Sequence, residues 1–172
     1  MKTLHVNIFN KQSINMAIRR LEEYKKEVET KTIALAQKLT DLGAEIVRIK
    51  IVEMGAYYSG ELLSGVSGYF SPLLNAGFIR VTSDHAAFVE FGTGVALGNT
   101  LHPNAEYLAK ASWSYGVGEK IFTTKDGKIG WVYPTDDGEF RFTEGMSSRP
   151  FMYETALELE GRFEQMAREV FA

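Results

Sequence analysis

The stretch from Ile14 to Ile49 reads INMAIRRLEEYKKEVETKTIALAQKLTDLGAEIVRI, and it decides how the rest of the chain is arranged. Apolar residues recur in it in alternating steps of four and three, interrupted only at Lys25 and Thr32. The apolar members of the series are Ile14, Ile18, Leu21, Val28, Leu35, Leu39, Leu42, Ile46 and Ile49. A period near 3.5 residues predicts one long amphipathic helix, with Asn10 or Ser13 as its N-cap.

This helix is too long for a compact domain made from this chain. About 36 residues with a rise of ~1.5 Å each span ~54 Å. A compact domain of 172 residues has a diameter of roughly 40 Å. An unbroken helix therefore protrudes and leaves part of its apolar stripe for another chain to cover. The alternative is a break at Gly43, because a glycine costs ~1 kcal/mol in a helix interior.

The composition excludes several classes of protein. Hydrophobic residues make up 45% and charged residues 24% of the chain, which is ordinary for a globular domain. The chain contains no cysteine, so disulfides and thiolate metal sites are excluded. No apolar run approaches ~18 residues and no signal peptide opens the chain, so we expect a protein that is made in a cytoplasm and neither secreted nor membrane-spanning.

Charge is distributed unevenly along the chain. Residues 1–50 carry 10 basic and 6 acidic groups, whereas residues 51–172 carry 9 basic and 16 acidic groups. An ordinary solvated surface explains this split most simply. The alternative is that copies or partners meet with the basic helical end against the acidic body. A pI of about 5.7, with no basic stripe that carries aromatic residues, does not indicate nucleic-acid binding.

The chain after the long helix predicts small antiparallel elements. A short strand is expected around Val66–Phe70, followed by a break at Ser71-Pro72, and a better strand covers Gly77–Thr82. The second strand is expected to pair with a third, Ala86–Phe91, through the tight connection Ser83–His85. Further on, a short helix is expected to begin at the proline of residues 103–110.

Two Asp-Gly pairs, at residues 126–127 and 137–138, predict a small β-meander over residues 120–143 that projects from the body. A closing helix is expected from about Ser148 as the N-cap, with Pro150 in its first turn. Its apolar stripe is Met152, Ala156, Leu159, Phe163, Met166 and Val170. The predicted fold class is thus α+β in a single domain, 1–172, with the long helix at about 13–52, the β region at about 63–143 and the closing helix at about 149–171.

Candidate chemistry is sparse. Asp84, His85 and Glu90 are the best enzymatic group, but Asp84 and Glu90 would lie ~20 Å apart on an extended strand and could not share a metal ion. The three histidines lack metal-ligand spacing, and no nucleophile elbow or phosphate loop is present. We therefore predict no catalytic, cofactor-binding or metal residue. Glu90 lies in an apolar run, so it must face solvent or be paired, and we predict an ion pair with Arg149, with Arg80 as the other candidate.

Three segments, taken together, resemble a known family. They are Ser59-Gly60-Glu61-Leu62 after the long helix, Phe88-Val89-Glu90-Phe91-Gly92-Thr93-Gly94, and Arg149-Pro150-Phe151-Met152 at the start of the closing helix. In this order they resemble the small head–tail joining proteins, also called neck or tail-completion proteins, of lambda-like long-tailed phages and prophages. The pattern covers nearly the whole chain, and its Val-Glu-Phe-Gly-Thr-Gly block is the most specific part.

The resemblance implies a non-enzymatic structural protein of the virion, located at the head–tail junction and in the host cytoplasm during assembly. It implies a homo-oligomeric ring, such as a hexamer, whose neighbours are neck or connector proteins and tail-terminator or tail-tube proteins. DNA would pass through this ring without specific binding. The implied interface and fold-defining residues are Gly60, Leu62, Glu90, Phe91, Gly92, Thr93, Gly94, Arg149, Pro150 and Phe151. The alternative is a helical adaptor or inhibitor that binds one cellular partner through the long helix.

Overall fold

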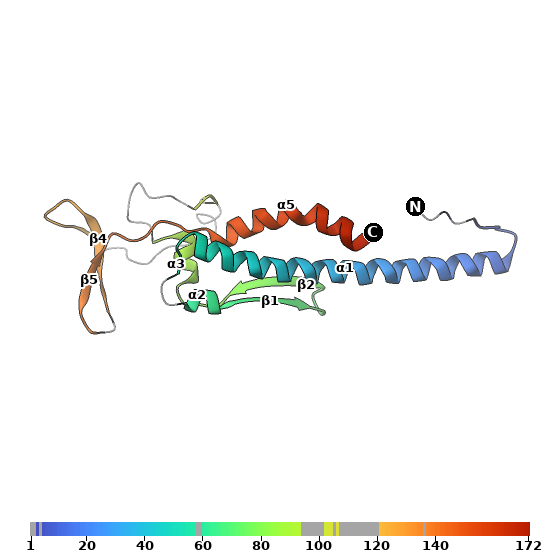
Figure 1. Ribbon diagram of the computed structural model, residues 1–172, viewed down its shortest axis with the longest axis horizontal. Coiled ribbons are helices and arrows are strands. Elements are labelled where there is room, and N and C mark those ends of the chain that lie inside the picture. The colour runs from blue at the N-terminus through green and yellow to red at the C-terminus, as the bar shows by residue number, and fades with distance from the viewer. Residues whose placement is uncertain are drawn as a thin grey trace.

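The computed structural model describes residues 3, 5–57, 60–93, 102–104, 106, 121–135 and 137–172. The predicted α+β class is confirmed: a long N-terminal helix is followed by two small antiparallel sheets and a C-terminal helix (Figure 1). In these described ranges, no helix is both long and apolar enough to cross a bilayer.

Helix α1 (Lys11–Glu53) is continuous over 43 residues, a length of ~65 Å. Asn10 is its N-cap, since Asn10 Oδ1 accepts the backbone N–H of Gln12 at 2.9 Å and that of Ser13 at 3.3 Å. The break considered at Gly43 does not occur. Gly43 is instead a close-packing position, because a Cβ there would lie 2.1 Å from Ile79 Cδ1 and 2.9 Å from Leu159 Cδ1.

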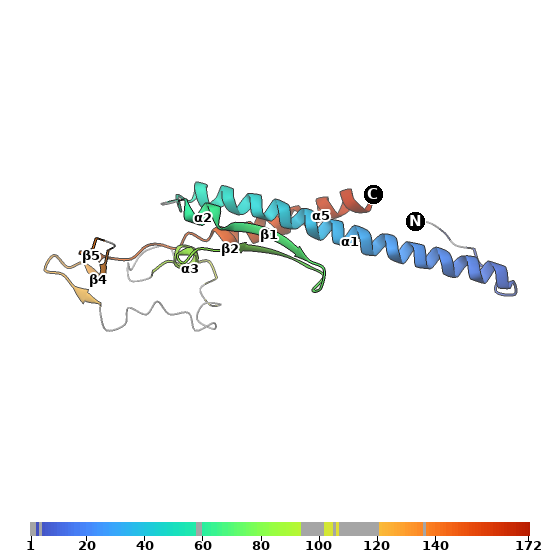
Figure 2. The same cartoon turned by 90° about the horizontal axis from the view of Figure 1, so that it is seen from below.

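A β-hairpin packs along one side of α1 (Figure 2). Its strands β1 (Val66–Ser71) and β2 (Ala76–Val81) are antiparallel, with Val66 opposite Val81 and Ser71 opposite Ala76. Two glycines of the hairpin, Gly68 and Gly77, face Thr40 of α1 so closely that an added Cβ would meet it. The hairpin backbone can thus lie directly on the helix.

The predicted pairing of β2 with Ala86–Phe91 is wrong. Residues Ala86–Phe91 form a short helix, α3, and β2 pairs with β1 instead. A short apolar run does not distinguish a strand from a buried helical turn, and here the tertiary packing decides. The helical form turns Val89 toward the hydrophobic core and buries Glu90.

The second sheet is the predicted meander. Strands β3 (Phe122–Thr123), β4 (Ile129–Pro134) and β5 (Phe140–Thr143) pair antiparallel in that order, which confirms the two Asp-Gly turns. The meander lies at the end of the molecule opposite the N-terminal end of α1 (Figure 1). The short helix expected over residues 103–110 falls mostly outside the described residues.

Helix α5 (Phe151–Phe171) confirms the closing helix and runs antiparallel to α1, on the side away from the hairpin (Figure 1). Two ion pairs between the helices show this antiparallel direction: Lys38 Nζ lies 2.6 Å from Glu169 Oε2, and Lys50 Nζ lies 3.2 Å from Glu158 Oε2. The predicted cap by Ser148 is wrong, because Pro150 occupies the N-cap position and has no side-chain cap.

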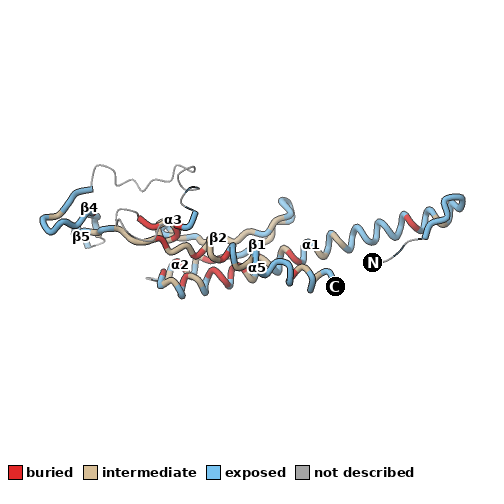
Figure 3. The backbone as a smooth tube through the Cα atoms, turned by 90° about the horizontal axis from the view of Figure 1, so that it is seen from above, coloured by how far each residue is buried: buried red, intermediate tan, exposed pale blue. Residues whose placement is uncertain are grey.

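The hydrophobic core lies where the C-terminal half of α1 meets the hairpin, the start of α5 and the short helix α2 (Glu61–Ser64). In Figure 3, the buried residues of α1 gather in this half. The buried members of the core are Ala44, Val47, Ile51, Ala56, Leu62, Val66 and Phe151.

Candidate functional site

The first candidate site is the junction between α3 and α5, which is organised by Glu90. This residue is only 6% exposed. Its carboxylate accepts the backbone N–H groups of Met152, at 2.8 Å, and Tyr153, at 3.0 Å. These donors belong to the first turn of α5, which carries partial positive charge and lacks intrahelical acceptors. Glu90 therefore caps α5 from a different part of the chain.

His102 completes this junction. Its Nε2 lies 3.1 Å from Glu90 Oε1, and its Nδ1 accepts the backbone N–H of Asn104 at 3.0 Å. Because Nδ1 is an acceptor, Nε2 carries the proton and donates it to the carboxylate. The imidazole lies between Phe91 and Tyr153, with centroid distances of 5.0 and 5.5 Å and edge-on geometry. The buried carboxylate is thus surrounded by donors and aromatic rings.

The predicted ion pair between Glu90 and Arg149 is wrong, and Arg80 does not take its place. Arg149 donates from its guanidinium to Gly55 O at 2.7 Å, and its backbone N–H donates to Val89 O at 2.9 Å. The helix N-terminus supplies the donors that a cation was expected to supply. His102, which sequence reasoning missed, lies twelve residues from Glu90, and no spacing rule connects the two.

The described residues of the three segments that carry the family resemblance are connected through the hydrophobic core and the segment before α5. Leu62 and Phe151 belong to one core cluster. Thr93 donates its backbone N–H to Met146 O at 3.0 Å, and its Oγ1 accepts the N–H of Met146 at 2.9 Å. Gly60 is the N-cap of α2 with a positive φ of 80°. The remaining implied residue, Gly94, lies outside the described residues.

Gly92 connects α3 to this junction in a backbone conformation that only glycine adopts readily, with φ of 77° and ψ of 169°. A Cβ there would lie 2.8 Å from both Met146 O and Ser148 N. Ser148, the residue predicted to cap α5, donates its hydroxyl to Glu90 O at 2.5 Å instead. The segment before α5 is therefore fastened to the end of α3 by backbone and side chain together.

The second candidate site is the N-terminal half of α1, residues Lys11–Ala34, which we call the free half. Helix α5 and the hairpin both end near Ala36, since Lys38 pairs with Glu169 close to the end of α5, and Gly77 in the hairpin packs beside Ala36 and Thr40. Only Ala17 is buried in the free half (Figure 3). About 24 residues, or ~36 Å of helix, thus extend beyond the body.

The free half exposes the apolar stripe that α5 covers further along the helix. In the stripe, Leu21 is 60% and Ile18 is 48% exposed, and Tyr24 at its border is 61% exposed. In proteins, a helix owes most of its stability to packing of its apolar face and little to intrinsic propensity. Large apolar areas are seldom left open on monomers. The stripe is therefore the surface of this chain best suited to contact another chain.

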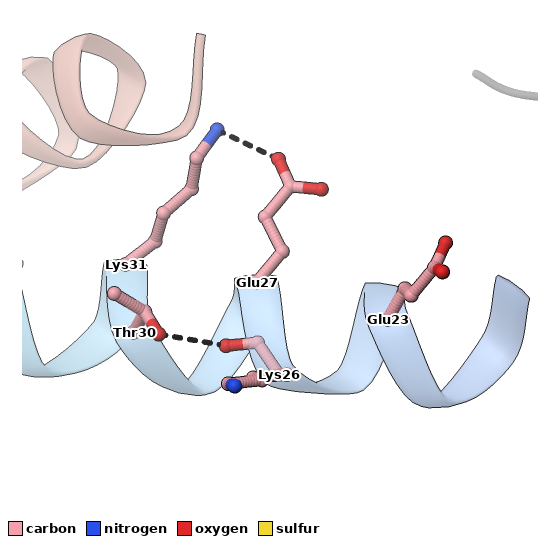
Figure 4. A pocket seen from close by; sticks show the side chains of 5 residues that line it. All are labelled: Glu23, Lys26, Glu27, Thr30 and Lys31. Atoms are coloured by element: carbon pink, nitrogen blue, oxygen red, sulfur yellow. Dashed lines mark hydrogen bonds and ion pairs between the residues drawn. The ribbon is translucent and has the colours of Figure 1, made fainter. Parts of the chain in front are cut away.

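A shallow depression on the free half is lined by charged residues of neighbouring helical turns. Figure 4 shows a shallow depression between Glu23 and Lys31, in which Lys31 Nζ lies 3.3 Å from Glu27 Oε1. Thr30 donates its hydroxyl to Lys26 O at 2.9 Å. These contacts join neighbouring turns of the same helix.

The residues considered for enzymatic chemistry are not brought together. Asp84 and His85 are exposed, whereas Glu90 is buried at the other end of α3 and contacts His102. In the part of the chain that the structure describes, no three His, Asp or Glu side chains are grouped as metal ligands would be. No family model matches the chain, and neither does any curated protein or solved structure.

Proposed function

We propose that this chain is a non-catalytic structural subunit of a phage or prophage head–tail junction, where it assembles as a ring with its own copies and with neighbouring neck and tail proteins. The observation that carries the proposal is the free half of α1. A helix that leaves ~36 Å of amphipathic surface outside its own body is suited to a part of a larger assembly.

The junction at Glu90 also supports a structural role. The two carboxylate oxygens accept two backbone N–H groups and the imidazole of His102, so the group is fully engaged in holding α3, α5 and residues 102–104 together. A buried carboxylate with this many donors stabilises one arrangement of the chain. Through these contacts Glu90, one of the residues that carry the family resemblance, fixes how α5 begins.

Two ends of the molecule are available for contacts in a ring. The free half of α1 lies at one end and the meander at the other (Figure 1). The meander carries exposed aromatic residues, and Phe140 is among the most exposed of them. A contact between different surfaces of successive copies closes into a ring when its rotation permits.

Electron microscopy of the purified chain tests the proposal, first alone and then mixed with the products of the neighbouring genes. We expect rings, and we expect antibodies against this chain to label the neck of intact tailed particles. A chain that forms no ring under any of these conditions and is absent from purified particles contradicts the proposal. A Leu21→Asp variant serves as the control, because it charges the exposed stripe without changing the core and should prevent ring formation.

The free half of α1 equally favours a second function, that of a helical adaptor or inhibitor bound to one cellular partner. An amphipathic helix with apolar residues at steps of three and four is the usual ligand of a hydrophobic groove. In that case the purified chain would form a complex of fixed stoichiometry with one host protein, remain absent from particles, and form no ring. Particle labelling therefore separates the two functions.

A further inference from the structure

We propose that, before assembly, the free half of α1 pairs with the free half of a second copy of this chain, antiparallel and about a two-fold axis near Tyr24. The inference rests on the proposed function in taking the free half as an assembly surface. It goes beyond that function because it concerns the free chain.

The apolar stripes of two copies align when the two helices run antiparallel. If Ile18 faces Val28 of the second copy, then Ile14 faces Thr32 and Leu21 faces Lys25, because all three pairs have the same midpoint. In antiparallel helix pairs, the two alternating seam positions face each other in this way. Ile14, Ile18 and Leu21 are all exposed, so the seam is accessible.

The charge at Lys25 selects the antiparallel direction. A parallel pair in register would place Lys25 beside Lys25 of the second copy, inside the seam, where like charges repel each other. In the antiparallel pair each Lys25 lies against Leu21 and next to Glu22 of the second copy. The ion pair that Lys25 makes within its own helix is exposed and long, at 3.8 Å from Glu29, so little is lost when it exchanges partners.

One border of the stripe is also self-complementary. Arg20, Tyr24 and Glu27 are spaced by four and three residues, so they lie along the same side of the helix. In the same register, reversing this row brings Arg20 to within about one residue, or ~1.5 Å, of the level of Glu27 of the second copy, and Tyr24 to within about two residues, or ~3 Å, of its own counterpart. Among the described residues, Arg20 has no ion-pair partner within the chain, whereas Glu27 holds Lys31 at 3.3 Å on the surface. A second copy therefore supplies the partner that Arg20 lacks.

This pair and a ring use the same surface at different times. A two-fold contact joins two copies that point in opposite directions and then closes, whereas a ring needs contacts between different surfaces of successive copies. The pair must therefore open before the chain enters a ring. Until then it keeps the apolar stripe of the free chain covered.

Disulfide cross-linking tests the two-fold axis directly, because the natural chain has no cysteine. In a Tyr24→Cys variant the two sulfurs lie on the same side of the pair and close to the axis, and mild oxidation should convert most of the chain to a covalent dimer. The matched control is Met16→Cys, since Met16 is 59% exposed but lies on the opposite side of the same helix. This variant should remain a single chain. Equal cross-linking of both variants, or of neither, overturns the proposal.

A charge exchange tests the register. Arg20→Glu and Glu27→Arg should each weaken the dimer by about five-fold in Kd, as expected for exposed ion pairs repeated by the two-fold axis. The combined variant should recover most of the lost affinity, because the pair is restored with its signs exchanged. Sedimentation at graded concentrations measures this. A combined variant weaker than either single variant overturns the register.

The outcomes separate this inference from the proposed function. Rings in the microscope without a Tyr24→Cys dimer contradict the two-fold pair and leave the structural function standing. A cross-linked dimer with no ring and no label on particles supports the two-fold pair and contradicts the proposed structural function. A natural chain that sediments at 19.3 kDa at every concentration contradicts the pair outright.

Discussion

The carboxylate of Glu90 accepts the backbone N–H of Met152 at 2.8 Å, so a residue of α3 caps a helix that begins 61 residues later in the chain, at Phe151. Helix caps are usually supplied by the residue just before the helix. Here that position holds Pro150, which has no side-chain donor or acceptor to offer. The start of α5 is consequently tied to the position of α3, and both are tied to His102.

Replacing Glu90 with glutamine should lower the free energy of unfolding by about 2 kcal/mol, because the charged acceptor is lost and an amide NH₂ group faces backbone donors. Urea unfolding monitored by circular dichroism measures the change. Glu160→Gln on the exposed face of α5 is the control and should change stability by less than ~0.5 kcal/mol. Equal stabilities of the two variants would contradict the capping role.

Gly92→Ala should destabilise the junction by about 3 kcal/mol. The backbone conformation at Gly92 alone costs an alanine ~1–3 kcal/mol, and the added Cβ would also press on the backbone of Met146 and Ser148. Gly127→Ala is the matched control, since its φ is 80° but nothing lies within 4 Å of the added Cβ. If thermal unfolding shows the same loss for both variants, the close approach to Ser148 has no energetic weight.

Two glycines in helices should respond in opposite directions to alanine. Gly161 in α5 has nothing within 4 Å of an added Cβ, so Gly161→Ala should stabilise the chain by about 0.5–1 kcal/mol through helix propensity. Gly43→Ala gains the same propensity but pushes Ile79 and Leu159 away from α1. We expect it to be about 1–2 kcal/mol less stable than Gly161→Ala. Differential scanning calorimetry of both variants decides this, and a stabilised Gly43→Ala would contradict the packing role.

The contact between α1 and α5 should weaken in acid. The hydrogen bond from Lys50 lowers the pKa of Glu158, and that from Lys38 lowers the pKa of Glu169, both from an ordinary value near 4.5. A carboxyl group whose pKa is lower in the folded state stabilises that state above its unfolded pKa. Its contribution disappears as the pH falls through the folded value.

A Glu158→Gln and Glu169→Gln double variant should therefore lose less stability than the natural chain between about pH 7 and about pH 3. Urea unfolding at a series of pH values measures both curves. Glu160→Gln, whose side chain is exposed and makes no ion pair among the described residues, should follow the natural curve. Parallel curves for the double variant and the natural chain would contradict this account.

Periodic patterns predicted the elements that need only local information. The four–three stepping from Ile14 to Ile49 was sufficient for α1, and the Asp-Gly pairs were sufficient for the turns of the meander. Residues Ala86–Phe91 were wrongly predicted as a strand, because a largely apolar run of six residues suits either state and the choice depends on what it packs against. The same error placed Glu90 on a strand and suggested Arg149 as its partner.

The sequence alone determined that this chain carries a helix longer than its own body, since helix length and apolar period are properties of consecutive residues. Only the tertiary structure decided how much of that helix remains exposed, because its packing depends on where α5 and the hairpin end beside it. It also decided the partners of Glu90. A buried carboxylate requires donors, but the sequence does not say whether a cation, a histidine or the first turn of a distant helix will supply them.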